Sequence, residues 1–161
     1  MLKVGVIGAG SISEFHIKPY LSNQQAELAA LCDVNESRLA EKGEMYGVSQ
    51  LYRDYRELLK DDAIDAVSIC TWNNSHAEIA IAALEAGKHV LVEKPLSMTV
   101  AEAEAVQEAV ERTGKVLQVG FVRRHGDNAK LLKTFIDNGD LGEIYYSKAS
   151  CLRRVGNPGG W

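Results

Sequence analysis

The sequence contains no apolar run long enough to cross a membrane. Its longest, at residues 88–93, is interrupted by charge and is far shorter than the roughly 20 residues that a membrane helix needs. From its first residues we expect no signal peptide. An excess of basic residues is also missing, because the formal net charge is −4, and this argues against binding to nucleic acid. We therefore expect a cytoplasmic protein that contacts neither membranes nor nucleic acids.

Cysteine is scarce. Cys32, Cys70 and Cys151 are odd in number, lie far apart and lack the Cys-x-x-Cys spacing of zinc and redox sites. This pattern is typical of a reducing compartment. We expect no metal site, and we expect each cysteine to be a small packed residue.

Apolar residues are abundant enough for a packed core. Of the 161 residues, 46% are hydrophobic and 25% are charged, which is the composition of a soluble folded domain. The charge is uneven: residues 121–161 carry seven Lys and Arg against four Asp and Glu, or +3, so residues 1–120 carry −7. We place a boundary near Gly120, with one domain at 1–120 and the incomplete start of a second at 121–161.

The first 120 residues alternate β-rich runs with amphipathic helical runs. This rhythm predicts βαβ units, a parallel sheet and helices on both of its faces. The fold class expected is a doubly wound α/β, or Rossmann, domain. The six expected strands are Leu2–Ile7, Leu28–Asp33, Gln50–Tyr52, Ala66–Cys70, His89–Val92 and Val116–Val119.

Helix boundaries carry their own signals. Ser75 with Glu78, and Thr99 with Glu102, have the spacing of capping boxes. The helices that they begin should end at Gly87 and Gly114, where a left-handed residue is favoured. Asn35 should cap a helix that runs to Tyr46, and Val100, Ala103, Val106 and Val110 should form a core-facing stripe.

The pattern changes after Gly120. Asp127–Asn138 is predicted as a helix, and Glu143–Arg154 as one long strand with no visible partner. A lone strand cannot satisfy its backbone amides, so the sequence resembles one cut off inside a truncated α+β domain. An exposed strand is also a template for pairing. We expect a homodimer through residues 121–161, formed either by antiparallel pairing of two such strands or by a swap of this segment.

A glycine-rich motif directly follows the first expected strand. The residues Gly8-Ala9-Gly10-Ser11-Ile12-Ser13 match the dinucleotide fingerprint Gly-x-Gly-x-x-Gly, with serine at the third glycine position. The first glycine permits the tight turn, the second lets the backbone approach a pyrophosphate, and the following helix offers its amides to the phosphates. An ordinary glycine-rich turn is the alternative. The motif predicts cofactor binding by Gly8, Gly10, Ser11 and Ile12.

Asp33 ends the second expected strand, 23 residues after Gly10. An acidic side chain there accepts hydrogen bonds from the adenosine ribose and repels a 2′-phosphate, so we predict NAD rather than NADP. A turn residue before the next helix is the alternative interpretation of Asp33. Arg38, one turn into that helix, either reaches the same ribose edge or is a solvated helix residue.

Two further segments follow the ends of expected strands, where parallel sheets bind their ligands. In Glu93-Lys94-Pro95 the proline, through a trans or a cis peptide bond, restricts the backbone of Lys94 and so orients its side chain. A neighbouring nicotinamide cation would favour the neutral form of the Lys94 amine, which makes Lys94 a candidate general base. A lysine that is merely solvated is the alternative. In Thr71-Trp72-Asn73, the hydroxyl and amide groups of Thr71 and Asn73 suit a cofactor groove walled by Trp72. His76 is either part of that site or a structural hydrogen-bonding residue.

Taken together, these residues resemble the glucose–fructose oxidoreductase, inositol dehydrogenase and rhizopine-catabolism family (Gfo/Idh/MocA). Two departures are visible: Trp72 replaces a usual proline, and Val122 stands where asparagine often precedes the arginine pair. The similar segments extend over essentially the whole chain: residues 8–13 with His16, Asp33, Thr71 with Asn73 and His76, residues 86–95, residues 119–124 and residues 141–144.

The resemblance implies an NAD(P)-dependent oxidoreductase that moves hydride between nicotinamide and a hydroxyl-bearing carbon of a sugar, inositol or related polyol. It implies that Lys94 assists proton transfer, that Glu93 and Arg123 belong to the cofactor site, and that Arg123 lies at the crossover into a substrate domain. The family's remaining catalytic groups would follow Trp161. We therefore expect cofactor binding with little or no turnover; a non-catalytic NAD-binding regulatory module and an inactive fragment are the alternatives.

Overall fold

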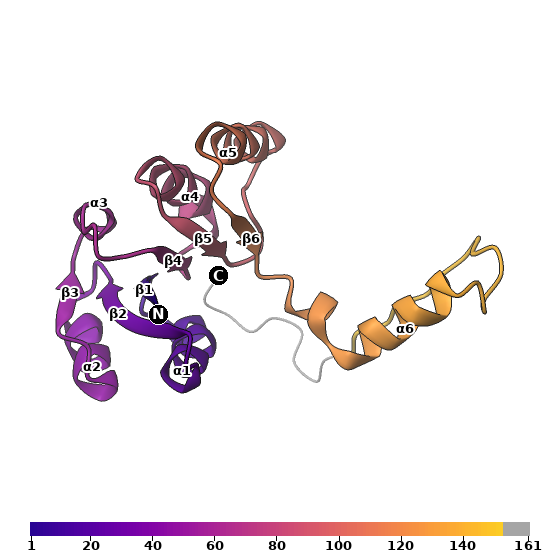
Figure 1. Ribbon diagram of the computed structural model, residues 1–161, viewed down its shortest axis with the longest axis horizontal. Helices are drawn as coiled ribbons and strands as arrows, with labels where there is room; N and C mark the ends of the chain where they lie inside the picture. The colour runs from indigo at the N-terminus through magenta and orange to yellow at the C-terminus, as the bar shows by residue number, and fades with distance from the viewer. Residues whose placement is uncertain (153–161) are drawn as a thin grey trace. The chain divides into compact units, whose positions relative to one another are not determined.

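The computed structural model describes residues 1–152 and divides the chain into two compact units, Met1–Gly120 and Phe121–Trp161. The first unit contains a six-stranded, fully parallel sheet with the strand order β3-β2-β1-β4-β5-β6 (Figure 1). The strands are β1 (Leu2–Ile7), β2 (Ala26–Cys32), β3 (Gln50–Tyr52), β4 (Ala66–Ile69), β5 (His89–Val92) and β6 (Leu117–Val119). The predicted doubly wound α/β fold is thereby confirmed.

Helices connect the strands and cover both faces of the sheet (Figure 1). They are α1 (Glu14–Ser22), α2 (Glu36–Tyr46), α3 (Tyr55–Leu59), α4 (His76–Glu85) and α5 (Val100–Thr113). One apolar cluster joins Val6 and Leu31 of the sheet to Ile17 of α1 and Leu39 of α2. A larger cluster on the other face packs β-strand residues against α3, α4 and α5. Successive apolar residues of a strand, such as Val6 and Ile7, enter opposite clusters, and such continuous apolar runs are expected for a sheet that is buried on both sides.

Most of the helix-boundary predictions are confirmed. Asn35 accepts a hydrogen bond from the Arg38 amide and caps α2. Thr99 and Glu102 form a complete capping box at α5. Gly87 and Gly114 adopt left-handed conformations, with φ of +77° and +65°.

The capping box predicted at Ser75 is wrong. A short 3₁₀ turn, Asn73–Ser75, precedes α4 and puts Ser75 in a helical conformation, so its side chain makes no capping hydrogen bond. Its hydroxyl instead donates to Thr71 Oγ1. Glu78 accepts hydrogen bonds from Tyr55 and Arg56 of α3, a tertiary contact that competes with the local box.

The second unit contains a short 3₁₀ turn, Val122–His125, and the helix α6 (Asp127–Asp137), close to its predicted bounds. The strand expected at 143–154 is not formed in residues 143–152, while Arg153 and Arg154 lie outside the described residues. A strand needs a partner for its backbone amides, and residues 121–152 contain no second strand to provide one. The homodimer, whose expected pairing rested on that strand, stays a prediction. None of the helices in residues 1–152 has the length and apolar character of a membrane span.

Candidate cofactor site

The strand order reverses between β1 and β4, and both strands end at the same edge of the sheet. The glycine-rich turn, residues 8–13, follows β1 at this switch point. Gly8 has a φ of +94°, and a Cβ atom built on it would lie 2.7 Å from the backbone carbonyl carbon and oxygen of Cys70. The Gly8 amide donates to the Cys32 carbonyl at 2.7 Å. The turn therefore lies tightly between the ends of β2 and β4, in space that only glycine leaves open.

Gly10 differs from Gly8 in having room. Its backbone is extended, with φ −69° and ψ −172°, and nothing lies within 4 Å of an added Cβ atom. The 3₁₀ turn Ser11–Ser13 starts here and continues into α1. Ser13, which replaces the third glycine, is fully buried, and its hydroxyl donates to the Gly10 carbonyl at 2.6 Å. Serine is accommodated here because it is small and because its hydroxyl finds a backbone acceptor.

Asp33 lies at the end of β2 and links three parts of the site. Its Oδ2 accepts the Ala9 amide at 2.8 Å, and its Oδ1 accepts the Asn35 amide at 2.8 Å. The Arg38 guanidinium is 3.3 Å from Oδ2, so Arg38 contacts Asp33, and its role at a ribose stays a prediction. The bond to Ala9 was not foreseen from the sequence. This bond ties the glycine-rich turn to Asp33. Asp33 also acts as a turn residue before α2, through its bond to the Asn35 amide.

The segment Glu93-Lys94-Pro95 follows β5 at the same edge, and the Lys94–Pro95 peptide bond is cis. The Lys94 side chain is exposed, whereas Glu93 is buried. One carboxylate oxygen of Glu93 accepts from the Lys94 amide at 3.2 Å, and the other lies 3.1 Å from Nε2 of His16. The Glu93 carboxylate is therefore already engaged by the backbone and by α1.

The segment after β4 is organised by His76. The His76 ring is 1% exposed; its Nδ1 lies 2.6 Å from the Pro95 carbonyl and its Nε2 lies 3.1 Å from the Thr71 carbonyl. Both ring nitrogens are thus occupied by backbone groups, which fits the structural alternative left open for this residue. His76 joins the turn after β4 to the cis-proline turn after β5. Trp72 is exposed, and Asn73 is partly exposed beside it.

Arg123, also predicted for this site, belongs to the second unit. Its role at the cofactor site therefore stays a prediction. Within residues 1–152, no group of three His, Cys, Asp or Glu is arranged to hold a metal ion.

Two thiols flank the site without serving as nucleophiles. Burial raises the pKa of Cys32 to about 12 and also raises the pKa of Cys70. Both thiols therefore stay protonated at neutral pH and act as packed apolar groups, as expected. Cys151 is exposed, so the prediction of packing was wrong for that residue.

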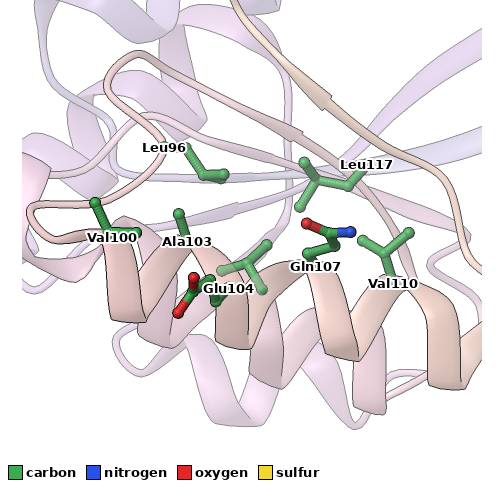
Figure 2. A pocket seen from close by; sticks show the side chains of 8 residues that line it. Leu96, Val100, Ala103, Glu104, Gln107, Val110 and Leu117 are labelled. Atoms are coloured by element: carbon green, nitrogen blue, oxygen red, sulfur yellow. The ribbon is translucent and has the colours of Figure 1, made fainter.

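A separate hollow of about 350 Å³ lies between α5 and β6 (Figure 2). It is lined mainly by apolar side chains such as Leu96, Val110 and Leu117. Val100 lines this hollow and is 75% exposed, so the prediction that Val100 packs in the core was wrong. Val106 is buried, as predicted. This lining has no basic side chain to hold phosphates, so the hollow does not compete with the glycine-rich turn as a dinucleotide site.

Comparison with known proteins agrees with this geometry. The model of an oxidoreductase family with an NAD-binding Rossmann fold matches residues 2–121. A myo-inositol 2-dehydrogenase of Thermotoga maritima is 39% identical over 142 residues, which are 88% of this chain and 42% of the relative. A D-glucoside 3-dehydrogenase of Escherichia coli is 38% identical over 98% of this chain and 45% of its own length.

Solved structures give the same result. A scyllo-inositol dehydrogenase from Lactobacillus casei with bound NAD(H) and scyllo-inositol superposes with a TM-score of 0.85 at 29% identity, covering 89% of this chain and 43% of that one. A probable dehydrogenase from Thermotoga maritima gives a TM-score of 0.84 at 40% identity, over 88% and 42%. The chain spans less than half the length of these relatives.

Proposed function

The chain belongs to the Gfo/Idh/MocA oxidoreductase family with its NAD-binding Rossmann fold, and from this premise we propose that its first unit binds NAD for hydride exchange with a sugar, inositol or related polyol. The observation that supports this most directly is the bond between Asp33 and Ala9. It joins a ribose acceptor to the turn expected to hold the diphosphate, so that one rigid element presents both. Relatives that act on inositol and on a glucoside favour the polyol class.

The residues present fit the cofactor. Gly8 and Gly10 shape the turn, and the start of the helical segment at Ser11 and Ile12 supplies amides for the diphosphate. A carboxylate has about four acceptor positions, and the Ala9, Asn35 and Arg38 contacts use three of those on Asp33. One position is left for a ribose hydroxyl, and a second is freed if Arg38 turns outward.

Each remaining residue has a defined task in this proposal. Bound NAD supplies a nicotinamide ring that accepts or returns hydride. Lys94, exposed at the end of β5, takes the proton from the substrate hydroxyl. Glu93 acts through Lys94, and Thr71 and Asn73 border the groove. His76 holds the turns after β4 and β5 together beneath it.

The first test measures binding and turnover on the same 161-residue sample. We expect calorimetry to detect NADH binding, and we expect little polyol-dependent reduction of NAD⁺. The physical reason for the second expectation is that hydride transfer needs the substrate held in place, whereas residues 121–152 form only a 3₁₀ turn and the helix α6. An absence of heat with NADH would contradict the cofactor assignment. Robust polyol oxidation would contradict the expectation of little turnover.

The cofactor preference rests on Asp33 and Arg38. Asp33→Ala should weaken NADH binding about tenfold or more, because it removes the ribose acceptor and the clamp on Ala9. Asp65→Ala is the matched control: Asp65 likewise accepts a backbone amide, that of Lys3 at 2.8 Å, but it precedes β4 and so lies at the opposite edge of the sheet from the turn. NADH affinity should not change in this variant.

We propose NAD over NADP because a 2′-phosphate would meet the Asp33 carboxylate. Titrations of the unaltered protein should therefore give a lower Kd for NADH than for NADPH, and Arg38→Ala should widen that gap by removing a cation beside Asp33. Equal affinities for NADH and NADPH would overturn the preference.

A further inference from the structure

A chain of polar contacts runs beneath the candidate site, from α1 through β4 to the end of β5. The Tyr20 hydroxyl lies 2.7 Å from Ser68 Oγ, Ser68 Oγ lies 3.3 Å from His16 Nδ1, and His16 Nε2 lies 3.1 Å from Glu93 Oε1. Ser68 is fully buried and Glu93 is 9% exposed. The residues come from segments up to 77 positions apart, so the fold, and not local sequence, assembles this relay of Tyr20, Ser68, His16 and Glu93.

With one proton on the His16 ring, the chemistry of the groups sets the direction of the hydrogen bonds. A carboxylate can only accept, so the His16 ring must carry its proton on Nε2 to bond Glu93. Nδ1 of the neutral ring is then an acceptor, and the single Ser68 proton donates to it. Ser68 Oγ is left to accept from the Tyr20 hydroxyl. Burial raises the pKa of Tyr20, which keeps this phenol protonated and able to donate.

The far end of the relay is confined as well. The second oxygen of Glu93 accepts from the Lys94 amide. Behind the carboxylate lies Gly120, where an added Cβ atom would come within 3.2 Å of Glu93 Oε1. In the observed position both carboxylate oxygens are bonded, and the bond to the Lys94 amide restrains the backbone there.

We propose that His16 is a positioning residue: protonated on Nε2 through Ser68 and Tyr20, it holds the Glu93 carboxylate against the Lys94 amide and so sets the place of the Lys94 side chain. This inference rests on the proposed function only for the role of Lys94. The hydrogen-bond polarity and the restraint on the Lys94 backbone are properties of the protein without cofactor, and they are tested in its absence.

The first experiment determines the tautomer of His16 in the unaltered 161-residue chain by ¹⁵N NMR at pH 8. The relay requires a neutral ring that is protonated on Nε2, with Nδ1 bare. A ring protonated on Nδ1, or on both nitrogens, would overturn the proposal. This result needs no variant and does not depend on whether NADH binds.

The second experiment follows hydrogen exchange at the Lys94 amide in two variants of His16. His16→Gln places an amide donor near the position of Nε2, whereas His16→Leu fills the space without a donor. We expect exchange at Lys94 within about threefold of the original for Gln and about tenfold or more faster for Leu, the loss expected for one charge-assisted hydrogen bond. The Val6 amide in β1 reports global unfolding, so only acceleration at Lys94 beyond that at Val6 counts.

Phe15→Leu is the control, because Phe15 neighbours His16 on α1 but is 76% exposed and should leave Lys94 exchange unchanged. If Leu at position 16 protects Lys94 as well as histidine does, the ring only fills space and the proposal is wrong. Equal acceleration by Gln and Leu would also overturn it. Failure of NADH to bind, with the expected tautomer and exchange, would count against the proposed function alone.

Discussion

Gly10→Ala is expected to weaken NADH binding about a hundredfold without loss of stability. In the free protein Gly10 is extended, at φ −69°, and an added methyl group meets nothing within 4 Å. Folding therefore has no need of glycine here, and the free energy of unfolding should stay the same or rise by about 0.5 kcal/mol from the lower entropy of the unfolded chain. A diphosphate lying on the turn does need it, because the methyl group would occupy the space of close approach.

Calorimetry with NADH and urea denaturation together check this separation of binding from stability. Gly126→Ala provides the control, since Gly126 has the same φ of −69° and an added Cβ atom would make only an ordinary contact at 3.6 Å. Its NADH affinity should not change, and its free energy of unfolding should stay the same or rise by the same ~0.5 kcal/mol. Undiminished affinity in Gly10→Ala would mean that the diphosphate does not lie on this turn, and the proposed function would lose its main support.

Gly8→Ala is expected to have the opposite signature, a large loss of stability whether or not cofactor is present. The residue has φ +94°, which costs about 1–2 kcal/mol for an alanine. Its Cβ atom would also lie 2.7 Å from the Cys70 carbonyl group. That neighbour is backbone beside the end of β4, so no side-chain rotation relieves the overlap and the β1–β4 junction must move apart. We expect the free energy of unfolding to fall by about 3 kcal/mol or more.

Urea denaturation of Gly8→Ala and Gly47→Ala distinguishes this overlap from conformational cost alone. Gly47 also has a left-handed φ, of +68°, but an added Cβ atom there meets nothing within 4 Å. Its replacement should therefore cost only about 1 kcal/mol. Equal losses in the two variants would show that the contact with Cys70 is relieved elsewhere and that the turn is less constrained than the structure indicates.

The predictions from sequence succeeded where neighbouring residues decide the outcome. Strands β1, β3 and β5 have the expected bounds, because apolar runs between turn residues are local signals. The capping box at Thr99 formed because both of its partners lie within one turn of helix. Asp33 was predicted to lie beside the glycine-rich turn from its spacing after Gly10 and its place at the end of a strand, and its carboxylate does accept the Ala9 amide. Its role toward a cofactor stays a prediction.

The predictions failed where residues distant in sequence decide the hydrogen bonds, either by competing for a side chain or by providing no strand to pair with. Ser75 looked like a cap, but Thr71 takes its hydroxyl and α3 takes Glu78. The segment at 143–152 has strand-like composition but no strand to pair with in residues 121–152. His16 was noted only as part of a family pattern, and nothing near it in the chain announces Ser68 or Glu93.

The order of residues by itself determined the βαβ rhythm, the glycine turn and the acidic residue that follows it, because these depend on steric and hydrogen-bonding preferences of adjacent residues. Tertiary structure alone decided which carboxylate oxygen meets which amide at Asp33 and how α1 reaches Glu93. Such contacts join segments that are remote in sequence. They exist only once the strands have packed in the order that brings their carboxyl ends to one edge.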